Sequence, residues 1–356
     1  MSNHPKVLEG KKVLVTGGTG SLGRTVVRRM LSGELGRPSQ IIVFSRDEAK
    51  QHYMRLDFLN NLSATDEVIY KNVEDVLDFR IGDVRDVDSL KRAVRGVEVV
   101  FHAAALKQVP SCERFPYEAV RTNITGAQNL VNAIAEEGKN VETVVGISTD
   151  KACKPINVMG MTKAVMERIL VEANLELEGV TVSCVRYGNV ISSRGSVVPL
   201  FNAQIRNGGP VTITLESMTR FLLTLDRAVD TVFAALLGAK PGETYVPFVD
   251  AANITDLARV MIGGRQVETK VTGIRPGEKV HEIMVSEEER FRTVCRPGYN
   301  GNYYVVLPML PELNPERVDE PVLEGEYSSC QANLTDEQLK ELVAPYMGFE
   351  TEAEFR

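Results

Sequence analysis

The stretch Ser148–Ala164, STDKACKPINVMGMTKA, holds the side chains best suited to chemistry. Thr149, Asp150 and Lys151 follow one another, so a hydroxyl, a carboxylate and an amine lie together in the sequence. Carboxylates and amines serve enzymes as general acids and bases when a fold positions and desolvates them. The stretch therefore predicts a reaction in which protons are both removed and donated.

A second pair of residues lies further along the same stretch. Lys163 follows Met159 at a spacing of four, which puts both side chains on one face of a helix. The spacing is that of a Tyr-x-x-x-Lys catalytic pair, but a methionine stands where the phenol would be. Because a thioether is not a useful proton acceptor, Met159 is expected to fill space. A proton that a tyrosine would take then needs another acceptor.

A glycine-rich turn, Gly17-x-x-Gly20-x-x-Gly23, follows a β-branched run and opens a helical pattern. Glycine permits the tight turn and lets backbone amides approach a pyrophosphate, whose charge the helix dipole favours. We therefore predict a dinucleotide site at this turn. The residues expected to hold the dinucleotide here are Gly17, Thr19, Gly20, Ser21, Leu22 and Gly23.

The end of the second strand indicates which cofactor binds. Ser45 and Arg46, with Lys50 one turn later, offer a hydroxyl and two cations that suit the 2′-phosphate of NADP. Asp47 is the alternative, because an acid here would bond the ribose of NAD. We favour NADP over NAD. Asp83 ends the third strand and is expected either to accept a hydrogen bond from adenine or to cap the next helix.

A parallel sheet with helices on both faces is needed to bring these segments together. Apolar runs alternate with helical patterns through the first half of the chain, which indicates an α/β fold with a doubly wound, Rossmann-type parallel sheet. The six strands expected are Lys12–Gly18, Gln40–Asp47, Val76–Asp86, Val97–Ala105, Val141–Thr149 and Thr181–Val190.

The regular alternation of apolar runs and helical patterns ends after Val190. Residues 1–190 are expected to form the NADP-binding Rossmann domain, and residues 216–249 to return to it. Residues 191–215 and 250–356 are then expected to form a smaller, partly discontinuous α/β domain that binds the substrate.

Composition excludes several classes of function. The 356 residues carry a formal net charge of -7 with a pI near 5.4, which argues against a nucleic-acid binder. No apolar run is long enough for a membrane span, and the N-terminus lacks the apolar core of a signal peptide. The 5 Cys and 4 His show no metal-ligand spacing, so we expect reduced thiols, no metal site and a cytoplasmic protein.

Several motifs together resemble the extended short-chain dehydrogenase/reductases: TGGTGSLG at 16–23, HAAA at 102–105, STDK at 148–151 and the Met159 and Lys163 pair. Within that group, AAALKQVPSCE, STDKA, RYGNV, SRGSVVPLF, MTRF and RPGEK look like the bacterial UDP-N-acetylglucosamine 4,6-dehydratases. The resemblance runs from about Gly10 to about Glu289, and the tail from Arg290 on carries no recognised motif.

The resemblance implies a nucleotide-sugar enzyme of a particular kind. A subset of these dehydratases has methionine in place of the tyrosine. Larger members carry an N-terminal helical region that anchors them to a membrane; this chain lacks it, which implies a soluble form. Family members are usually dimers or hexamers, so a homo-oligomer is expected. The substrate implied is UDP-N-acetylglucosamine, and the smaller domain would bind the UDP-sugar.

Roles for the residues of the first stretch follow from this resemblance. In the family, the matching aspartate is the acid for O6 and the matching lysine is the base for C5, which implies that Lys151 is at least partly neutral, with Lys163 as a cationic neighbour. Thr149 could donate to the C4 oxygen, and Lys163 would bond the nicotinamide ribose. We hypothesise that Asp150 also takes the O4 proton, and that Met159 packs against the sugar or the nicotinamide.

Further binding residues are implied by the matching motifs. Those expected at the cofactor are Val84, Ala103, Ala104, Ala105, Lys107, Tyr187 and Asn189. Those expected at the UDP-sugar are Lys107, Asn189, Arg194, Val198, Thr212, Thr214, Arg220, Arg275 and Glu278. The arginines suit a diphosphate, because a guanidinium pairs with two phosphate oxygens at once.

Three alternatives remain open from the sequence. The dehydratase could invert rather than retain the configuration at C5. A nucleotide-sugar 4-epimerase would share the fold, but it would need a tyrosine and no acid–base pair for elimination. A non-catalytic NADP-binding regulator could also have lost the tyrosine, although it would have no need of Asp150, Lys151 and Lys163.

Overall fold

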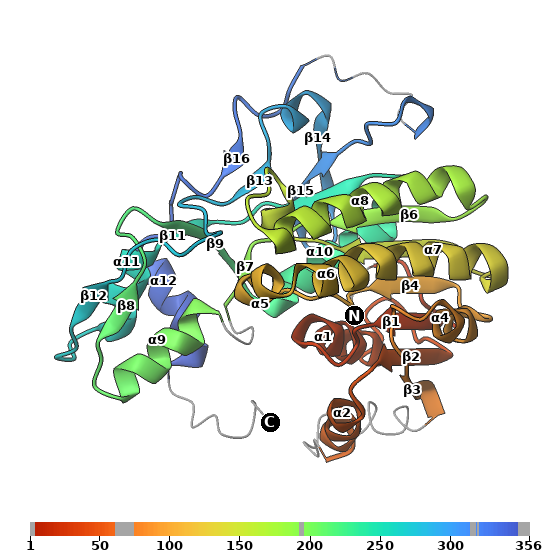
Figure 1. Cartoon of the computed structure of the whole chain (residues 1–356), viewed down its shortest axis with the longest axis horizontal. Coiled ribbons are helices and arrows are strands. Elements are labelled where there is room, and N and C mark those ends of the chain that lie inside the picture. Colours follow the sequence, from red (N-terminus) through yellow and green to blue (C-terminus); the bar gives the residue numbers. More distant parts are fainter. Residues whose placement is uncertain (1–3, 61–74, 192–195, 314–317, 319, 348–356) are drawn as a thin grey trace.

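A sheet of nine strands runs through the centre of the molecule (Figure 1). The computed structural model describes residues 4–60, 75–191, 196–313, 318 and 320–347. The strands of this sheet are β1 (Lys12–Thr16), β2 (Gln40–Ser45), β3 (Leu77–Ile81), β4 (Val99–His102), β5 (Thr143–Ile147), β6 (Thr181–Val185), β10 (Thr244–Pro247), β14 (Thr293–Gly298) and β15 (Gly301–Val306). All six strands expected from the first half of the chain are therefore present, each within its expected range.

The order of the strands is β14-β15-β10-β6-β5-β4-β1-β2-β3. Neighbours from β3 to β10 pair in parallel, whereas at the edge β15 pairs antiparallel with both β10 and β14. The order β3-β2-β1-β4-β5-β6 is that of a doubly wound, Rossmann-type sheet. The predicted fold class is confirmed.

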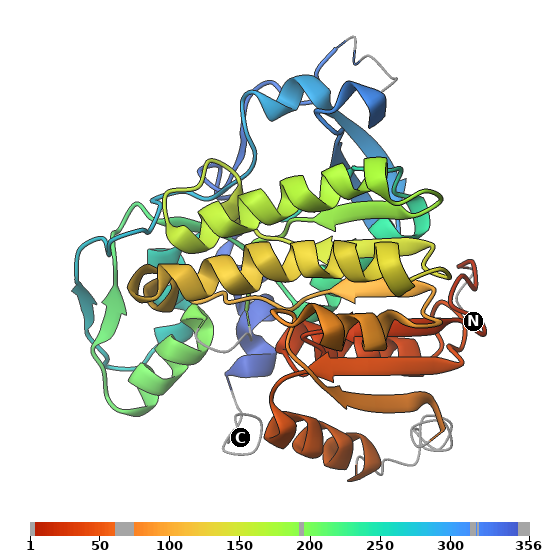
Figure 2. The same ribbon diagram turned by 45° about the vertical axis from the view of Figure 1, so that its right-hand side comes forward.

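Helices cover both faces of the sheet, as the apolar strands require (Figure 2). On one face, α1 (Ser21–Leu31) and α10 (Leu225–Gly238) pack in one apolar core. On the other face, α4 (Val87–Val94), α7 (Gly126–Glu137) and α8 (Val158–Glu176) pack in a second core. Shorter or peripheral elements of this half are α2 (Glu48–Asn60), α5 (Val109–Arg114), α6 (Pro116–Ala119), the π-helix η1 (Val120–Thr125) and the 3-10 helix η2 (Asp150–Ala152).

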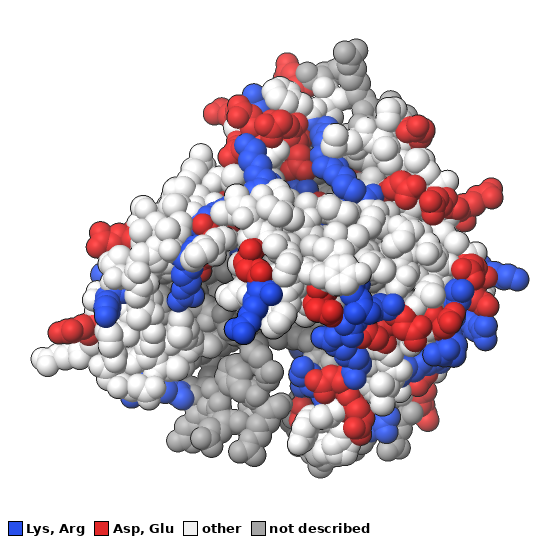
Figure 3. Space-filling model, in the orientation of Figure 1, with Lys and Arg blue, Asp and Glu red and all other residues white. Residues whose placement is uncertain are grey.

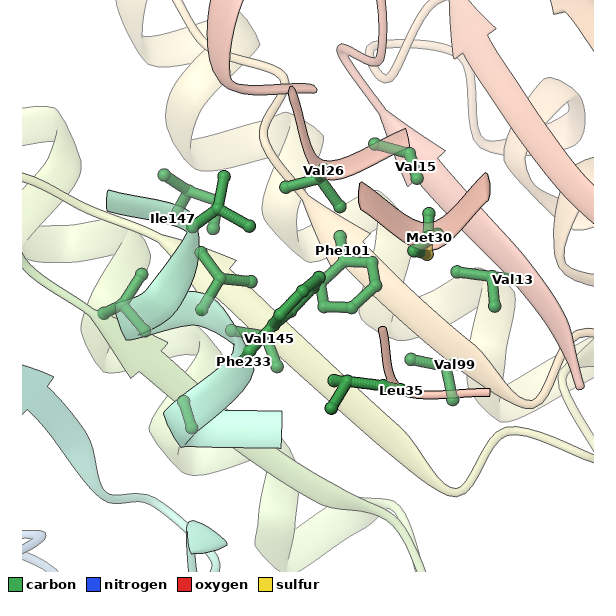
Figure 4. Packing of buried hydrophobic residues seen from close by; sticks show 14 of the residues in the cluster. Val13, Val15, Val26, Met30, Leu35, Val99, Phe101, Val145, Ile147 and Phe233 are labelled. Atoms are coloured by element: carbon green, nitrogen blue, oxygen red, sulfur yellow. The ribbon is translucent and has the colours of Figure 1, made fainter. Parts of the chain in front are cut away.

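Close packing joins the returning helix α10 to the first core. Figure 4 shows Phe233 of α10 against Phe101 of β4 and Val145 of β5, with Val26 and Met30 of α1 nearby. Each of these side chains is almost fully buried. Of residues 216–249, α10 and β10 join the larger unit, since β10 lies beside β6, whereas β9 (Thr219–Leu223) pairs with other strands outside the main sheet.

A smaller lobe follows the first six strands. Its elements are β7 (Asn189–Val190), α9 (Val197–Arg206), β8 (Val211–Ile213), β9 (Thr219–Leu223), β11 (Ala251–Asn253), α11 (Ile254–Ile262), β12 (Thr269–Val271), β13 (Ile283–Val285), β16 (Tyr327–Ser328), α12 (Asp336–Val343) and the 3-10 helix η5 (Ala344–Tyr346). The 3-10 helices η3 (Glu289–Arg292) and η4 (Pro311–Leu313) contact β15 and α8 of the larger unit, respectively. Helices α9, α11 and α12 share one apolar core. In the described ranges, no helix is both long enough and apolar enough to cross a bilayer.

The C-terminal third is divided between the two units. Its strands β14 and β15 form a hairpin that extends the main sheet next to β10, whereas α12 packs against α11 in the smaller lobe. Residues 250–356 thus supply both units, not the smaller one alone. The assignment of cofactor and UDP-sugar to the two units stays a prediction.

One buried ion network ties the sheet to the C-terminal segment. The Arg186 guanidinium, just past β6, donates to Glu167 of α8 at 2.7 and 2.9 Å and to Glu289 of η3 at 2.7 and 2.9 Å. It also donates to the Met284 carbonyl at 3.0 Å. Burial by itself would raise the pKa of Glu289, but the Arg186 charge lowers it to about 2. The network therefore fixes the 284–289 segment beside the ends of β5 and β6.

Replacing Arg186 by leucine is expected to destabilise the protein by about 3–5 kcal/mol, because Glu167 would lose its buried counter-charge and Glu289 would keep only Arg292. The urea midpoint of unfolding measures this loss. Arg168→Ala, which removes an exposed guanidinium from the same helix α8, is the control and should stay within about 0.5 kcal/mol of the parent. Equal midpoints for the two variants would contradict the role of the network.

Candidate active site

The carboxyl ends of β1, β4, β5 and β6 lie at one edge of the sheet, and the residues expected to do chemistry follow these ends directly. Gly17 and Ala103 come immediately after β1 and β4, while Thr149 and Tyr187 lie two residues beyond β5 and β6. The strand order reverses between β1 and β4, which is where sheets of this kind bind ligands. The sheet therefore places the glycine turn and the Asp150–Lys151 segment at the same edge.

Gly17 is required by a close approach of two backbone segments. Its φ of +67° is unfavourable for other residues, and a Cβ atom would lie only 2.7 Å from the Ala104 nitrogen. The preceding Thr16 hydroxyl is hydrogen-bonded to His102 Nδ1 at 2.9 Å. The turn is thus packed against the end of β4, which leaves its outer side for a ligand.

The N-terminus of α1 has the properties of a phosphate site. Gly20 caps the helix without any side-chain hydrogen bond, and no acidic residue occupies the first turn. A Cβ on Gly23 would lie 2.6 Å from the Gly18 Cα, so the helix can start this close to the strand only with glycine there. Uncapped amides and the helix dipole suit the pyrophosphate of a dinucleotide, so these residues fit the cofactor that the sequence predicts.

Two exposed cations, Arg46 and Lys50, follow the end of β2. Arg46 is 54% exposed, and its Nη1 lies 3.9 Å from Asp83 Oδ2. Asp47 instead accepts from the Lys50 backbone at 3.0 Å and pairs with the Lys50 ammonium at 2.9 Å, so it caps α2. The Ser45 hydroxyl is buried and accepts from Gln51 Nε2 at 3.1 Å. Of the three residues predicted to hold a 2′-phosphate, Arg46 and Lys50 are both exposed, and Lys50 is paired with Asp47 whereas Arg46 has its nearest carboxylate at 3.9 Å.

Asp83 does not cap the helix that follows β3. The N-cap of α4 is Asp86, whose carboxylate accepts from the Asp88 nitrogen at 3.0 Å. Asp83 pairs with the Arg85 guanidinium at 2.6 and 2.9 Å, and this pairing lowers its pKa against the effect of burial. The prediction that Asp83 could cap this helix was therefore wrong, because the N-cap position is Asp86, three residues after Asp83.

Thr149, Asp150 and Lys151 are drawn into one hydrogen-bonded cluster. Asp150 Oδ1 accepts from the Thr149 hydroxyl at 2.8 Å and from Lys151 Nζ at 3.0 Å. The Asp150 side chain is 1% exposed and that of Lys151 21% exposed. Asp150 Oδ2 is buried and has no hydrogen-bond partner among the described residues. One carboxylate oxygen is thus fixed while the other keeps its capacity to accept a proton.

Lys151 is held as an ammonium, contrary to the expectation of a partly neutral amine. Burial alone would lower its pKa, but the carboxylates of Asp150 and Glu282 raise the pKa above the usual value. Glu282 Oε1 lies 3.1 Å from Lys151 Nζ, almost as near as Asp150. The cationic neighbour is Arg220 rather than Lys163. Glu282 was not foreseen, since nothing in its sequence context distinguishes it from a surface glutamate.

Lys163 lies deeper, beneath the end of β5. Its ammonium donates to the Ile147 carbonyl at 2.5 Å and contacts Met166 Sδ at 3.0 Å. Burial lowers the pKa of Lys163 to about 8. Burial and this neighbouring charge lower the pKa of His102 to about 3, so His102 is neutral. Lys163 is therefore the more readily deprotonated of the two lysines in this state of the protein.

Met159 packs inside the protein rather than against open space. Its side chain is 4% exposed and lies in an apolar cluster with Cys112 of α5 and Ala119 of α6. It thus fills space as expected, but its partners are protein side chains, because α5 and α6 lie beside the start of α8.

Tyr187 has a phenol near the site, but this phenol cannot serve as the proton acceptor that a tyrosine at position 159 would supply. Tyr187 follows β6, and its carbonyl accepts from the Asp150 nitrogen at 3.1 Å. Burial and the charge of Asp150 raise the pKa of the Tyr187 phenol. The phenol is therefore protonated at neutral pH and is not available as a proton acceptor.

A residue that sequence reasoning missed is Asn123, in the π-helix η1. Its amide donates to the Leu106 carbonyl at 3.0 Å and to the Thr162 hydroxyl at 2.9 Å, and its Oδ1 accepts from the Leu106 nitrogen at 2.8 Å. It thereby joins the loop after β4 to α8. Single turns of π-helix are frequent at functional sites, but only the structure reveals this one.

The remaining cofactor residues lie near the sheet edge with different exposures. Val84 is buried, and its carbonyl accepts from Asn129 at 2.9 Å. The side chains of Ala103, Ala104 and Ala105 are half-buried, whereas Lys107 is exposed. Asn189 forms β7, and its Oδ1 is buried without a hydrogen-bond partner among the described residues.

The residues expected at the sugar nucleotide are not all presented to a ligand. Val198 is buried in the core of the smaller lobe. Arg220 is also buried, and its guanidinium donates to the carbonyls of Thr219, Lys279 and Val280 at 2.7–3.1 Å. These contacts use part of the donor capacity of Arg220, and its place at a diphosphate stays a prediction. Arg194 lies outside the described residues.

Other expected sugar residues are more accessible. Thr212 lies in β8 and accepts from Gln204 Nε2 at 2.8 Å, and Thr214 follows half-buried. Arg275 is 57% exposed, 3.8 Å from Glu278.

The loop that holds Arg275 and Glu278 is fastened beside the reactive segment. Asn157, at the start of α8, donates to the Gly277 carbonyl at 2.7 Å. The Lys279 ammonium donates to the Cys153 carbonyl at 2.6 Å. This loop therefore borders the segment that holds Asp150 and Lys151.

A cavity of about 570 Å³ lies next to this segment without containing its reactive groups. It is lined by Cys153–Pro155, by α8 and by η3, but not by Asp150, Lys151 or Lys163. Arg186, in its wall, is already paired with Glu167 and Glu289. We therefore place the candidate chemistry at the strand ends and not in this cavity.

Comparisons with known proteins show which family and which solved structures this chain resembles. Residues 13–301 match the family described as polysaccharide biosynthesis protein. A UDP-glucose 4-epimerase of Rickettsia felis is 44% identical over 294 residues, which cover 81% of this chain and 82% of that protein. The X-ray structure of Pen from Bacillus thuringiensis has a TM-score of 0.82 and 33% identity, covering 95% of this chain and 99% of Pen.

A more distant solved structure shares the fold alone. DesIV, a dTDP-glucose 4,6-dehydratase from Streptomyces venezuelae with NAD and TYD bound, has a TM-score of 0.63 and 22% identity. The likeness covers 76% of this chain and 86% of DesIV.

Replacing Gly17 by alanine is expected to weaken binding of a nicotinamide dinucleotide at least about tenfold, because the added Cβ would displace the turn from β4. Isothermal titration calorimetry measures the binding. Gly10→Ala is the matched control, since Gly10 has a similar φ of +70° but open space around its Cβ position. If the two variants bind the dinucleotide equally well, the close approach at Gly17 does not shape the site.

Proposed function

The chain belongs to the polysaccharide biosynthesis protein family, and we propose that it is a UDP-N-acetylglucosamine 4,6-dehydratase. Its product would be a UDP-4-keto-6-deoxy-N-acetylhexosamine. The observation that carries the proposal is the buried pair of Asp150 and Lys151 at the end of β5. An elimination needs an acid and a base side by side, and a simple alcohol oxidation does not.

The reaction divides into proton transfers by the protein and hydride transfer by its cofactor. When bound, the nicotinamide would take a hydride from sugar C4 and return it to C6, so it is regenerated in each turnover. Asp150 would receive the O4 proton on Oδ2 and later give it to the leaving O6. Lys151 would remove the C5 proton, and Thr149 would donate to the C4 oxygen. Lys163 would hold the nicotinamide ribose.

Asp150 suits the double role because of how its two oxygens are engaged. Oδ1 is occupied by Thr149 and Lys151, whereas Oδ2 has no partner among the described residues. A buried carboxylate with one unsatisfied oxygen gains a hydrogen bond when a substrate hydroxyl arrives. The cycle of protons would thus close without a phenol, which agrees with methionine at 159.

A nucleotide-sugar 4-epimerase is the second candidate, favoured by the name of the Rickettsia felis relative. An epimerase needs one group that takes and returns the O4 proton, and Asp150 could serve. It would have no use for Lys151 as a base at C5. Whether a dehydratase would retain or invert C5 is a separate question, answered by ring couplings in the proton NMR spectrum of the product. A non-catalytic regulator would turn over neither substrate.

NADP is the cofactor that we propose. Arg46 offers a largely exposed guanidinium at the end of β2, and Asp47, which would favour NAD, is engaged with Lys50. A guanidinium in this position would pair with the 2′-phosphate.

A homo-oligomer and a cytoplasmic location also stay proposals. Exposed apolar side chains on α8, Met161 and Val165, support a contact between subunits. The surface over α7 and α8 carries few charges, as Figure 3 shows, whereas acidic and basic side chains alternate around it. Light scattering of the purified protein would give the assembly size.

Incubation of the protein with UDP-N-acetylglucosamine is expected to release water from the sugar, detected as a mass loss of the nucleotide sugar. Asp150→Asn should reduce both water loss and reduction of the bound cofactor by at least about 100-fold, because O4 loses its proton acceptor. Asp226→Asn changes an exposed carboxylate and is the control. An epimer without water loss would support the second candidate, and normal cofactor reduction in Asp150→Asn would refute the role of Asp150.

Arg46→Ala is expected to weaken NADP+ binding about tenfold to 100-fold and to leave NAD+ binding nearly unchanged, because only NADP+ has the 2′-phosphate. Calorimetric titration with each cofactor measures the difference. Arg95→Ala removes a similarly exposed guanidinium at the end of α4 and should affect neither titration. Equal losses for both cofactors would count against the proposed preference.

A further inference from the structure

Glu282 shares the Lys151 ammonium with Asp150. Its Oε1 lies 3.1 Å from Lys151 Nζ, and Asp150 Oδ1 lies 3.0 Å from the same nitrogen. The Glu282 side chain is 2% exposed, so this is a contact between buried carboxylates and one amine. Like Asp150 Oδ2, Glu282 Oε2 is buried without a partner among the described residues. Each carboxyl group thus keeps one oxygen able to take a proton.

The position of Glu282 is set by its backbone rather than by Lys151. Its nitrogen donates to the Ser329 hydroxyl at 2.9 Å, and its carbonyl accepts from the Ser329 nitrogen at 2.8 Å. The Ser329 hydroxyl is in turn 2.8 Å from that of Thr219 in β9. Three separate segments of the smaller lobe therefore hold this carboxylate against η2.

The charges that face this cluster come from several elements. Arg220 of β9 has its Nε 3.9 Å from Glu282 Oε1. Lys279, in the preceding loop, interacts with the charges of Glu282, Asp150 and Lys151. Asp150 also interacts with the phenol of Tyr187. The two buried carboxylates are therefore matched by three cations, of which Lys151 alone contacts both.

This arrangement poses a chemical difficulty for the proposed function. A base at C5 must be a neutral amine, yet two carboxylates hold Lys151 in its charged form. Release of the proton to solvent is unfavourable at neutral pH even though the Lys151 side chain is 21% exposed, because both carboxylates stabilise the ammonium. A nearby acceptor would remove the difficulty.

We propose that Glu282 is that acceptor: it takes a proton from Lys151 and thereby makes Lys151 the base of the elimination. The inference rests on the proposed function and deepens it. Glu282 acts through Lys151 and is a positioning and proton-accepting residue, not one that touches the sugar. Nothing in the motifs that resemble the dehydratases pointed to it.

The proton steps balance over one turnover. Asp150 takes the O4 proton and becomes neutral, which removes one of the two negative charges beside Lys151. The Lys151 ammonium then passes a proton to the Glu282 carboxylate, and a neutral amine and a neutral acid result. The amine takes the C5 proton while Asp150 gives its proton to the departing O6. After C5 regains a proton from Lys151, Glu282 returns its own to the amine.

The first arm of the test uses the 4-keto product, whose C5 hydrogen can exchange with solvent without hydride transfer. Wild-type protein and Glu282→Gln are incubated with it in D2O, and C5 deuteration is followed by NMR. We expect exchange at neutral pH to fall by at least about 100-fold in Glu282→Gln. Reduction of the bound cofactor by UDP-N-acetylglucosamine should persist, because that step requires Asp150 and not Glu282.

The pH profile separates proton transfer from a structural role. In the wild type, exchange should be nearly independent of pH from about 7 to 9, since Glu282 takes the proton internally. In Glu282→Gln, the amine forms only by release of a proton to solvent, so the rate should rise about tenfold per pH unit until Lys151 titrates. A merely distorted site would be slow at every pH.

Two further variants guard against misfolding. Glu282→Asp keeps a carboxylate and should recover part of the exchange, with a flat profile. Glu243→Gln removes an equally buried carboxylate that pairs with Arg296 at 2.7 Å, away from Lys151, and should exchange like the wild type. If Glu282→Gln exchanges at the wild-type rate, or if its slow exchange does not respond to pH, the proposal is overturned.

A second arm is independent of any sugar. The rate at which acetic anhydride modifies Lys151, read by mass spectrometry as a function of pH, reports the pKa of this lysine. Glu282→Gln should lower that pKa, and an unchanged pKa would overturn the proposal even if no substrate were turned over. If the wild type neither exchanges C5 nor releases water while the pKa still shifts, the proposed function fails and the Glu282–Lys151 coupling stands.

Discussion

Continued pairing of β5 with β6 beyond their regular ends is the constraint on which the site depends. The Ser148 nitrogen donates to the Val185 carbonyl at 2.7 Å, and the Asp150 nitrogen donates to the Tyr187 carbonyl at 3.1 Å. These bonds hold the reactive segment in line with the sheet, so the Asp150 carboxylate is directed by a rigid element rather than by a loop. The same sheet brings the glycine turn, which follows β1, to the same edge, with β4 between β1 and β5.

Charge is the second feature that organises this part of the molecule. Arg186 joins β6, α8 and η3 through two buried carboxylates. Lys151 joins η2 to Glu282, the residue that precedes β13. Buried ion pairs contribute little net stability, but they fix geometry, because removal of one partner leaves an uncompensated charge. The segment from 282 to 289 is therefore held against the strand ends at two points. A site built in this way can position protons closely while most of its groups are hidden from water.

The absence of a phenol at 159 is consistent with this arrangement of charges. Met159 lies in an apolar cluster with Cys112 and Ala119, and the nearby phenol of Tyr187 stays protonated. Proton transfer must therefore run through carboxylates and amines. Asp150, which follows β5, and Glu282, which precedes β13, both contact the Lys151 ammonium and are both almost fully buried.

The sequence by itself determined the Rossmann-type sheet, the glycine turn and the Asp150–Lys151 segment, because each depends on local patterns: apolar periodicity, glycine spacing and neighbouring residue types. It did not reveal that Asp86 rather than Asp83 caps α4, that β14 and β15 extend the main sheet, or that Asn123 joins two helices. Nor could it show that Lys151 is charged. Asp150, its sequence neighbour, and Glu282 together raise the pKa of Lys151. Glu282 is distant along the chain and is brought to Lys151 only by the packing of β13 against η2. Local spacing fixes which groups a segment carries, whereas their protonation depends on charges that only the tertiary structure brings near.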